Sequence, residues 1–477
     1  MIMQKLVLGF LLLACAACTE DFEVLNTNPN QPVEVQPELL LRQVIYDYGE
    51  EMSYEGFVAG NLLGQYFAEV DFNLFDRHSL TEPQFGGNPW PSIYTNLRDN
   101  ELLLQQARTE AAQAVYEGPA LILKAYMTAA LTDIYGDVPY SEALRGLDGE
   151  VTPVYDAQER IYTGPDGILE NLEDGIAAIE SYNGSVPLGG DILFGGHLDG
   201  WVRLAHSLQI KYLMRISGRE DVAARLQGRF DEGNYILSNS QNATFDFTDG
   251  PPNNFRLATL RSGDFNLFVL SETMQAILVG LDDPRLATFF RPTQNDPTQF
   301  NGLLNGQDAS ATSISVADFS LTGTRFREET GRLEANFMTA WETSFWLAEA
   351  AAKGFIAADA QALYERGVSQ AFAYWDTPLP TDYLDTGAAA FDADNAVAQI
   401  LTQKWIASII NGYEGWIEWR RTGFPALRDV AASLNNGLIP VKMPYPADEP
   451  ALNATNFAAA TGSEGNSVNV AVWWDVD

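Results

Sequence analysis

The residues between 68 and 92 have the side chains best suited to binding chemistry. They read AEVDFNLFDRHSLTEPQFGGNPWPS and mix aromatic rings with carboxylate, amide and guanidinium groups around a Gly86-Gly87 turn. Aromatic rings stack on the apolar faces of sugars, and planar polar groups pair with neighbouring hydroxyls, so this composition is typical of a sugar-binding loop. The opposite interpretation stays open, because Phe72 and Trp90 could equally anchor the loop to the core.

A second irregular stretch, residues 239–335, is the other candidate for ligand contact. It contains an expected helix near 270–281, followed by DDPRLATFFRPTQNDPTQFNGLLNGQ. Phe289, Phe290 and Phe300 could face a sugar, and the first two could equally belong to the core.

Residues that would support catalysis are few in type. The three histidines, His78, His197 and His206, lie on separate segments without the HxxxH or HExxH spacing of a zinc site. No GxSxG elbow of a serine hydrolase occurs. Carboxylates are abundant, but those of a glycosidase are recognised only by their separation in space, so a surface glycosidase stays the less favoured alternative. We therefore predict that the protein is not an enzyme and has no catalytic residue, metal or cofactor.

The overall charge limits the possible partners. The 477 residues include 64 acidic and 28 basic side chains, which gives a net charge of −36. Such a surface repels the phosphates of nucleic acids and also disfavours anionic polysaccharides. We expect no nucleic-acid partner.

The loops need a scaffold, and the sequence predicts that helices supply it. Gly118-Pro119 opens a helix that runs to Tyr135, in which only Lys124 and Asp133 are charged from Leu121 onward. A helix that is apolar on all faces belongs inside a large core. We therefore place this helix at the centre of the fold.

Helical pairs recur along the chain. We predict hairpins over 93–135, 166–217 and 338–375, an incomplete one ending near 411, and one or two helices over 37–67. Asp166 and Asp199 are the predicted N-caps of the second hairpin. The expected fold class is mostly α: tetratricopeptide-like helical hairpins, without an exact 34-residue period, form a scaffold decorated by long irregular loops and few short strands.

The first 18 residues, MIMQKLVLGFLLLACAAC, predict export. A lone Lys5 precedes a short apolar run, as in a signal peptide, and small residues precede Cys18. We predict a signal peptide over 1–17 and lipid attachment at Cys18, with Cys15 as a competing candidate. A lipidated tether over 18–36 then leads into a single domain over 37–477.

Several segments together resemble one family. The sequence TDIYGDVPYSEAL at 132–144 resembles the signature of the SusD/RagB family, in its SusD-like branch. The acidic cluster and NTNPN that follow Cys18, the sequence GYEGWIEWRRTGFP at 412–425 and the closing AVWWD are similar to other segments of that family. Trp416, Trp419 and Arg420-Arg421 are predicted to be structural: the tryptophans seal the C-terminal segment onto the helices and the arginines pair with carboxylates.

The resemblance implies a function that the residues alone do not. SusD-like proteins are lipid-anchored at the cell surface of the outer membrane, where they bind a nutrient, usually a glycan, and deliver it to a TonB-dependent, SusC-like transporter as its lid. A peptide-binding protein of the same architecture stays an alternative. Because related proteins contact ligand through the loop before the central hairpin, the predicted ligand-binding residues are Asp71, Asn73, Phe75, Arg77, Trp90, Phe300 and Asn301.

Overall fold

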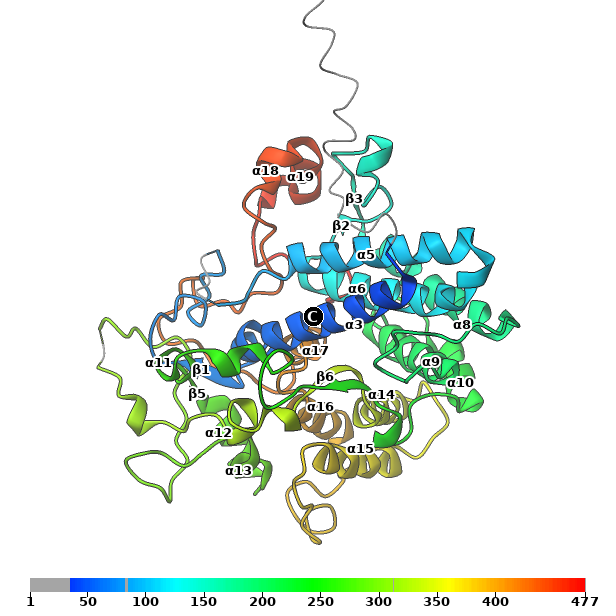
Figure 1. The fold of residues 1–477 in the computed structure, drawn as a ribbon. Helices are drawn as coiled ribbons and strands as arrows, with labels where there is room; N and C mark the ends of the chain where they lie inside the picture. The colour runs from blue at the N-terminus through cyan, green and yellow to red at the C-terminus, as the bar shows by residue number, and fades with distance from the viewer. Residues whose placement is uncertain (1–34, 82–84, 312, 477) are drawn as a thin grey trace, which may run out of the picture.

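Helices dominate the computed structural model, which describes residues 35–81, 85–311 and 313–476 (Figure 1). The predicted mostly α class is confirmed. The predicted signal peptide and Cys18 lie outside the described residues. None of the helices in the described part is both long and apolar enough to cross a membrane.

The N-terminal helix α3, Pro37–Glu55, crosses the middle of the molecule in Figure 1. Its proline occupies the first turn, where a missing N–H is tolerated. A π-helical turn, Gly56–Gly60, and the short α4, Asn61–Leu63, continue it. Both glycines face the backbone of a distant segment, and a Cβ at Gly60 would lie only 2.0 Å from the carbonyl oxygen of Gly412. The turn therefore depends on glycine for close backbone packing.

The first hairpin pairs α5, Trp90–Thr109, with α6, Glu117–Tyr135, through the 3-10 turn Ala111–Tyr116. The prediction of a central α6 is confirmed. Only Glu117, Lys124, Tyr126 and Ala130 of this helix are partly exposed. Gly136, with φ of 83°, ends it in a conformation that other residues rarely adopt.

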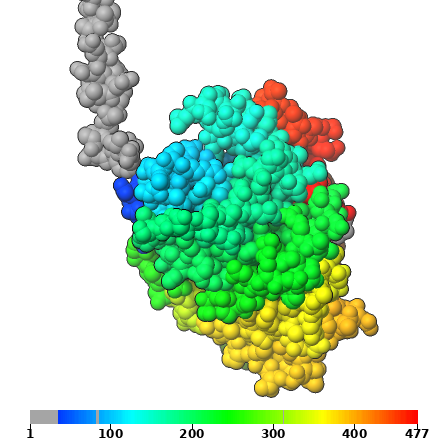
Figure 2. Space-filling view, turned by 90° about the vertical axis from the view of Figure 1, so that its right-hand side faces the viewer, coloured from blue at the N-terminus to red at the C-terminus, as the bar shows by residue number. Residues whose placement is uncertain are grey.

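The remaining helices stack on this hairpin largely in chain order. Helix α8 packs on α6, α9 on α8, and α14 on α9, while α15 and α16 pack on α14. Figure 2 shows the result as successive layers, from the cyan first hairpin through the green middle to the yellow helices at the other end. The bounds of these helices are α7 Gln158–Thr163, α8 Ile168–Ser181, α9 Leu198–Arg215, α10 Ala223–Glu232, α14 Ala340–Ala352, α15 Ala360–Tyr374, α16 Ala396–Ala407 and α17 Glu414–Thr422.

The two predicted N-caps are wrong. Helix α8 begins after Gly167, and the carboxylate of Asp166 instead pairs with Lys124 of α6 at 2.8 Å. Helix α9 begins two residues earlier than an N-cap at Asp199 would give, after His197, so Asp199 is inside its first turn and pairs with Arg203 at 2.8 Å. In both places an ion pair takes the carboxylate that the sequence alone assigns to capping.

Strands are few and short in the part of the chain that the structure describes. Three antiparallel pairs join β1 to β5, β2 to β3 and β4 to β6. Their bounds are β1 Phe67–Glu69, β2 Val138–Pro139, β3 Tyr155–Asp156, β4 Ala243–Asp246, β5 Phe268–Leu270 and β6 Glu334–Met338. Short helices accompany them in the irregular regions: α11 Ser262–Phe265, α12 Glu272–Gly280, α13 Arg285–Phe289, α18 Glu449–Leu452 and α19 Ala454–Thr461.

Residues 138–156, which include the β2–β3 pair, form an arm that projects at the top of Figure 1 beside α18 and α19. The side chains of Asn453 and Asn456 donate hydrogen bonds to the carbonyl oxygen of Pro153, so the arm and these late helices are joined.

A network of ion pairs lies at the centre of the helical stack. Arg215 of α9 is fully buried and lies 3.5 Å from Asp133, 2.7 Å from Glu414 and 3.1 Å from Glu418. On the α17 side, Arg421 pairs with Glu349 at 2.7 Å and with Glu418 at 2.8 Å. The remaining members are Lys211, Glu342 and Lys404.

This network agrees with the structural role predicted for the C-terminal segment. Trp416 is fully buried, and Arg421 pairs with two carboxylates as expected. The guanidinium of Arg420 also donates to the carbonyl oxygens of Val441 and Asp133.

Candidate functional site

The loop that follows β1 is held to two distant segments. The side-chain amide of Asn73 donates to the carbonyl oxygen of Gln307, and the guanidinium of Arg77 donates to that of Ala432 at 2.9 Å. The backbone N–H of Leu434 in turn donates to the carbonyl oxygen of Arg77. Residues 69–81, 300–311 and 428–438 therefore form one continuous region, which we call the loop surface.

A buried carboxylate organises the loop surface from beneath. Asp76 accepts hydrogen bonds from the Asn305 side chain and from the backbone N–H groups of Glu69 and Gly306. Burial raises the pKa of Asp76 to about 6, although these hydrogen bonds oppose the shift. Burial, and after it the charge of Asp76, raises the pKa of Glu69 well above its usual range. Both carboxyl groups are buried, and that of Asp76 holds the loops together through its hydrogen bonds.

The predicted residues of the first loop differ in what they present to solvent. Asp71 is exposed, whereas Asn73 and Phe75 are buried, with Phe75 packed under Gly87. Arg77 is half-buried and lies 3.7 Å from Asp308. Phe72, which was left open, has a side chain that is 63% exposed. Among these five residues, the groups that face solvent are therefore one carboxylate, one ring and part of one guanidinium.

The predicted residues of the second irregular stretch lie on the same loop surface. Asn301 is exposed, and its side-chain amide donates to the carbonyl oxygen of Asp318 at 2.8 Å. Phe300 is half-buried and packs against the main core. Phe289 and Phe290 are fully buried, which settles their open alternative in favour of the core.

Trp90 stands apart from the other predicted residues. As the first residue of α5 it is 8% exposed, and its ring lies 4.9 Å from that of Tyr94, 5.0 Å from that of Tyr135 and 5.9 Å from that of Tyr445. Its large apolar area stabilises the junction between the first hairpin and the projecting arm. Because Trp90 is nearly buried, it can affect a ligand site only by holding these tyrosines in position.

One of those tyrosines, Tyr94, lines a cleft between α5, α6 and the first residues of the arm. The cleft has a volume of about 230 Å³. Its walls come from Leu97, Glu101 and Gln105 on α5, Lys124, Thr128 and Leu131 on α6, Pro139 to Ser141, Ala143 to Arg145 and Asp148 on the arm, and Asp166 before α8. We call this the α5–α6 cleft.

The polar groups of the α5–α6 cleft are in place before any ligand binds. Lys124 donates to both carboxylate oxygens of Asp166, at 2.8 and 3.0 Å, and its ammonium lies 5.6 Å from the centre of the Tyr140 ring. On the opposite wall, Gln105 donates to Glu101 at 3.1 Å. The hydroxyl of Tyr94 donates to the carbonyl oxygen of Pro139 and so ties α5 to the arm.

The sequence analysis did not identify this cleft, although two signals pointed to it. From Leu121 to the end of α6, Lys124 is one of only two charged residues, and its side chain is 16% exposed. Tyr140 and Ser141 belong to the TDIYGDVPYSEAL segment, which was used only to recognise a family. A lone cation on a buried helix indicates a place where that helix reaches a polar cavity or an ion pair.

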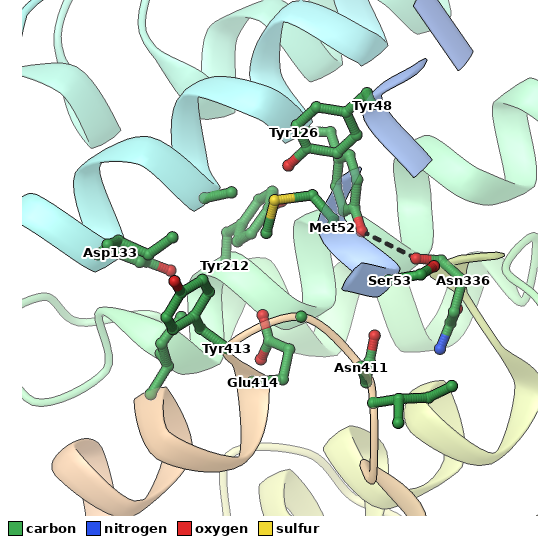
Figure 3. Close-up of a pocket in the computed structure, with 15 residues that line it drawn as sticks. Tyr48, Met52, Ser53, Tyr126, Asp133, Tyr212, Asn336, Asn411, Tyr413 and Glu414 are labelled. Atoms are coloured by element: carbon green, nitrogen blue, oxygen red, sulfur yellow. Dashed lines mark hydrogen bonds between the residues drawn. The ribbon is translucent and has the colours of Figure 1, made fainter. Parts of the chain in front are cut away.

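A second cavity, shown in Figure 3, lies inside the helical stack. Tyr48 and Met52 of α3, Tyr126 of α6 and Glu414 of α17 surround it, and the Tyr126 hydroxyl donates to the carbonyl oxygen of Asn336 at 3.4 Å. Its volume of about 30 Å³ has room for only one or two water molecules. It is a small gap beside the ion pairs and has no room for a nutrient.

Within residues 35–81, 85–311 and 313–476, no group of three or more histidine, cysteine, aspartate or glutamate side chains is arranged to hold a metal ion.

The comparisons with known proteins agree on one family. The SusD-like family model, described as starch-binding and associating with the outer membrane, matches residues 29–446. No curated protein matches the chain in sequence.

Solved structures resemble the chain over almost its whole length. A chitin-binding protein is 24% identical with a TM-score of 0.79, and the match covers 93% of this chain and 100% of that one. A SusD homologue from Bacteroides fragilis is 22% identical with a TM-score of 0.79, over 93% of this chain and 100% of that one. A chitin-binding SusD homologue from Flavobacterium johnsoniae is 22% identical with a TM-score of 0.76, over 92% and 98%. At such identities these structures show a shared fold.

Proposed function

Because the chain belongs to the SusD-like family, we propose that it is a cell-surface binding protein that captures a nutrient and delivers it to a TonB-dependent outer-membrane transporter, over which it acts as a lid. The nutrient is an oligosaccharide or a polysaccharide. A lipid on Cys18 holds the protein at the outer membrane, and no bond of the nutrient is made or broken.

The observation that carries this proposal is the extent of the family match. The model described as starch-binding and associating with the outer membrane spans residues 29–446, which include the scaffold, the loop surface and the α5–α6 cleft. Two of the similar structures are described as chitin-binding. A neutral glycan also suits a chain whose net charge is −36, because an anionic one would be repelled.

The predicted ligand-binding residues take two roles in the proposal. Asp71, Arg77 and Asn301 contact the glycan directly, because their polar groups lie at or near the exterior of the loop surface. Asn73, Phe75, Trp90 and Phe300 act through the shape they give to the site, because their side chains are wholly or partly enclosed. Loops held on a rigid scaffold are the usual place for such contacts.

Calorimetry tests this function directly. The soluble chain from Asn26 onward is titrated with chitin oligosaccharides, starch oligosaccharides, acidic glycans and peptides, and each mixture is then analysed for cleavage products. We expect saturable binding of a neutral glycan without products. The variant Asp71→Ala weakens binding several-fold, whereas Asp394→Ala, which removes an equally exposed carboxylate elsewhere, does not.

Other outcomes select another function. Binding of peptides alone supports the peptide-capturing alternative, and release of shorter sugars indicates a surface glycosidase. Partnership is tested separately by purifying the lipidated protein from the outer membrane of the cells that make it. Absence of a TonB-dependent transporter from that preparation contradicts the lid role.

A further inference from the structure

We infer that the α5–α6 cleft binds one neutral sugar ring and is a site separate from the loop surface. The inference rests on the proposed function in one respect, namely that the nutrient is a glycan. It assigns a subsite to residues that the predicted loop contacts do not include.

The size of the α5–α6 cleft selects a small ligand. Its volume of about 230 Å³ falls just below the range of roughly 300–1,000 Å³ typical of sites for larger organic molecules. A stretch of polysaccharide would not fit within it, whereas one sugar ring would. Two regular helices and the tied arm form the walls, so the shape exists before the ligand arrives.

The charges of the α5–α6 cleft select a neutral ligand. The lining contains two cations, Lys124 and Arg145, and three carboxylates, Glu101, Asp148 and Asp166. The pairs Lys124–Asp166 at 2.8 Å and Arg145–Asp148 at 3.4 Å compensate each other and leave one carboxylate in excess. An anionic ligand would face that excess within a strongly acidic protein, so a neutral ligand is favoured.

The remaining groups suit vicinal hydroxyls. Glu101 supplies acceptors, while Gln105 and Lys124 supply donors from the two facing helices. The rings of Tyr94 and Tyr140 add apolar surface to the walls. This combination of a few convergent polar groups with aromatic walls is the usual composition of a small-molecule site.

The floor of the cleft contains a side chain that lacks a partner. Thr128 is fully buried, and its hydroxyl forms no hydrogen bond with any described residue. Burying an unpaired hydroxyl costs about 1–3 kcal/mol in proteins, so an apolar residue of the same size would be more stable at this position. Because the hydroxyl is buried beneath the cleft, a polar ligand would satisfy it only after a small shift of the lining side chains.

Ligand-observed NMR and calorimetry together test the inference. Saturation-transfer NMR of the purified protein is recorded with neutral monosaccharides, with sugar acids and with amino acids, and glycan affinity is then measured by calorimetry. We expect transfer to neutral sugars, and a loss of about tenfold or more in affinity in Lys124→Met and in Glu101→Ala. Glu180→Ala, an exposed glutamate of α8 outside the lining, serves as the matched control and retains the affinity of the parent.

The possible results distinguish failure of the inference about the cleft from failure of the proposed function. If a glycan binds and both cleft variants bind it as tightly as the control, the inference is overturned while the proposed function stands. If sugar acids or amino acids give the signal instead, the assigned ligand class is wrong. If no neutral sugar or glycan binds in either measurement, the glycan-binding function itself fails and the inference fails with it.

Discussion

The ion pairs at the centre of the helical stack and those of the α5–α6 cleft use the same kinds of side chain for different ends. In the interior, Arg215 is fully buried among three carboxylates. In the cleft, Lys124 has a single ion-pair partner, Asp166, whose side chain is 62% exposed. The interior pairs hold helices together, whereas the cleft pair can exchange a contact with water or ligand at small cost.

The difference follows from solvation. Two charges in water gain little by pairing, so an exposed pair contributes about 0–1 kcal/mol. A buried charge that loses its partners keeps the cost of its desolvation, and removing one partner costs about 3–5 kcal/mol. Ion pairs with similar N···O distances therefore hold helices rigidly in the interior, whereas in the α5–α6 cleft the charged groups can still contact a ligand.

Replacing Arg215 should have the largest effect on the stability of the fold. Arg215→Met leaves Asp133, Glu414 and Glu418 with fewer counter-charges in a buried site, so we expect the free energy of unfolding to fall by about 3–5 kcal/mol. Denaturation by urea measures the loss. Arg225→Met, which removes one exposed ion pair with Glu173, is the matched control and should cost less than about 1 kcal/mol. Equal losses in the two variants would contradict the contrast.

The pH dependence of stability sharpens the contrast through Glu349. Burial alone would raise the pKa of Glu349, but the charges of Arg421 and Lys404 outweigh it and hold the pKa at about 2, below the ordinary 4.5. A carboxyl with a lowered pKa stabilises the fold above pH 4.5, and that stabilisation is lost as the pH falls toward 2.

Glu349→Gln should therefore lower the free energy of unfolding at pH 7 by on the order of 3 kcal/mol. The deficit relative to the parent should shrink as the pH falls below 4.5, and denaturation curves at pH 7, 5 and 3.5 would follow it. A deficit that is the same at every pH would show that Glu349 contributes by packing rather than by charge.

Thr128 gives the smallest expected effect, and it has the opposite sign. Thr128→Val removes an unpaired buried hydroxyl, so we expect the ligand-free protein to gain about 1 kcal/mol of stability. The same change should weaken the binding of a neutral sugar, which calorimetry measures. A variant that loses stability, or that binds as tightly as the parent, would show that the hydroxyl has no part in the cleft.

Helix positions were predictable because apolar periodicity is a local signal. The central α6 and the pairs around α9 and α14 fall within a few residues of their predicted ranges. The caps at Asp166 and Asp199 were not predictable in the same way, because each carboxylate meets a cation outside the capping geometry. Lys124 lies 42 residues before Asp166, and sequence patterns do not report contacts at such a distance.

The sequence predicted which kinds of side chain lie in the first loop, but not which of them face solvent. The loop before α5 does contain exposed Asp71 and Phe72, but Asn73 turns inward to donate to the carbonyl oxygen of Gln307, and Phe75 packs under Gly87. Gln307 comes from a distant part of the chain. The α5–α6 cleft was not predicted for the same reason. Its lining residues come from two helices and the arm, and only the folded chain brings them together.

The indole of Trp474, near the C-terminal end of the chain, binds a carboxylate of α6 that Tyr162 also binds. Its Nε1 donates to Asp133 of α6 at 2.7 Å, and the Tyr162 hydroxyl donates to the same oxygen at 2.6 Å. The Trp474 ring also lies 5.6 Å from the Arg215 guanidinium. A growing chain therefore leaves the Asp133 oxygen partly unpaired until residue 474 has been synthesised. A chain that lacks Trp474 loses one of the two donors to this buried oxygen, so we expect its loss to harm folding more than the loss of a residue from an exposed loop.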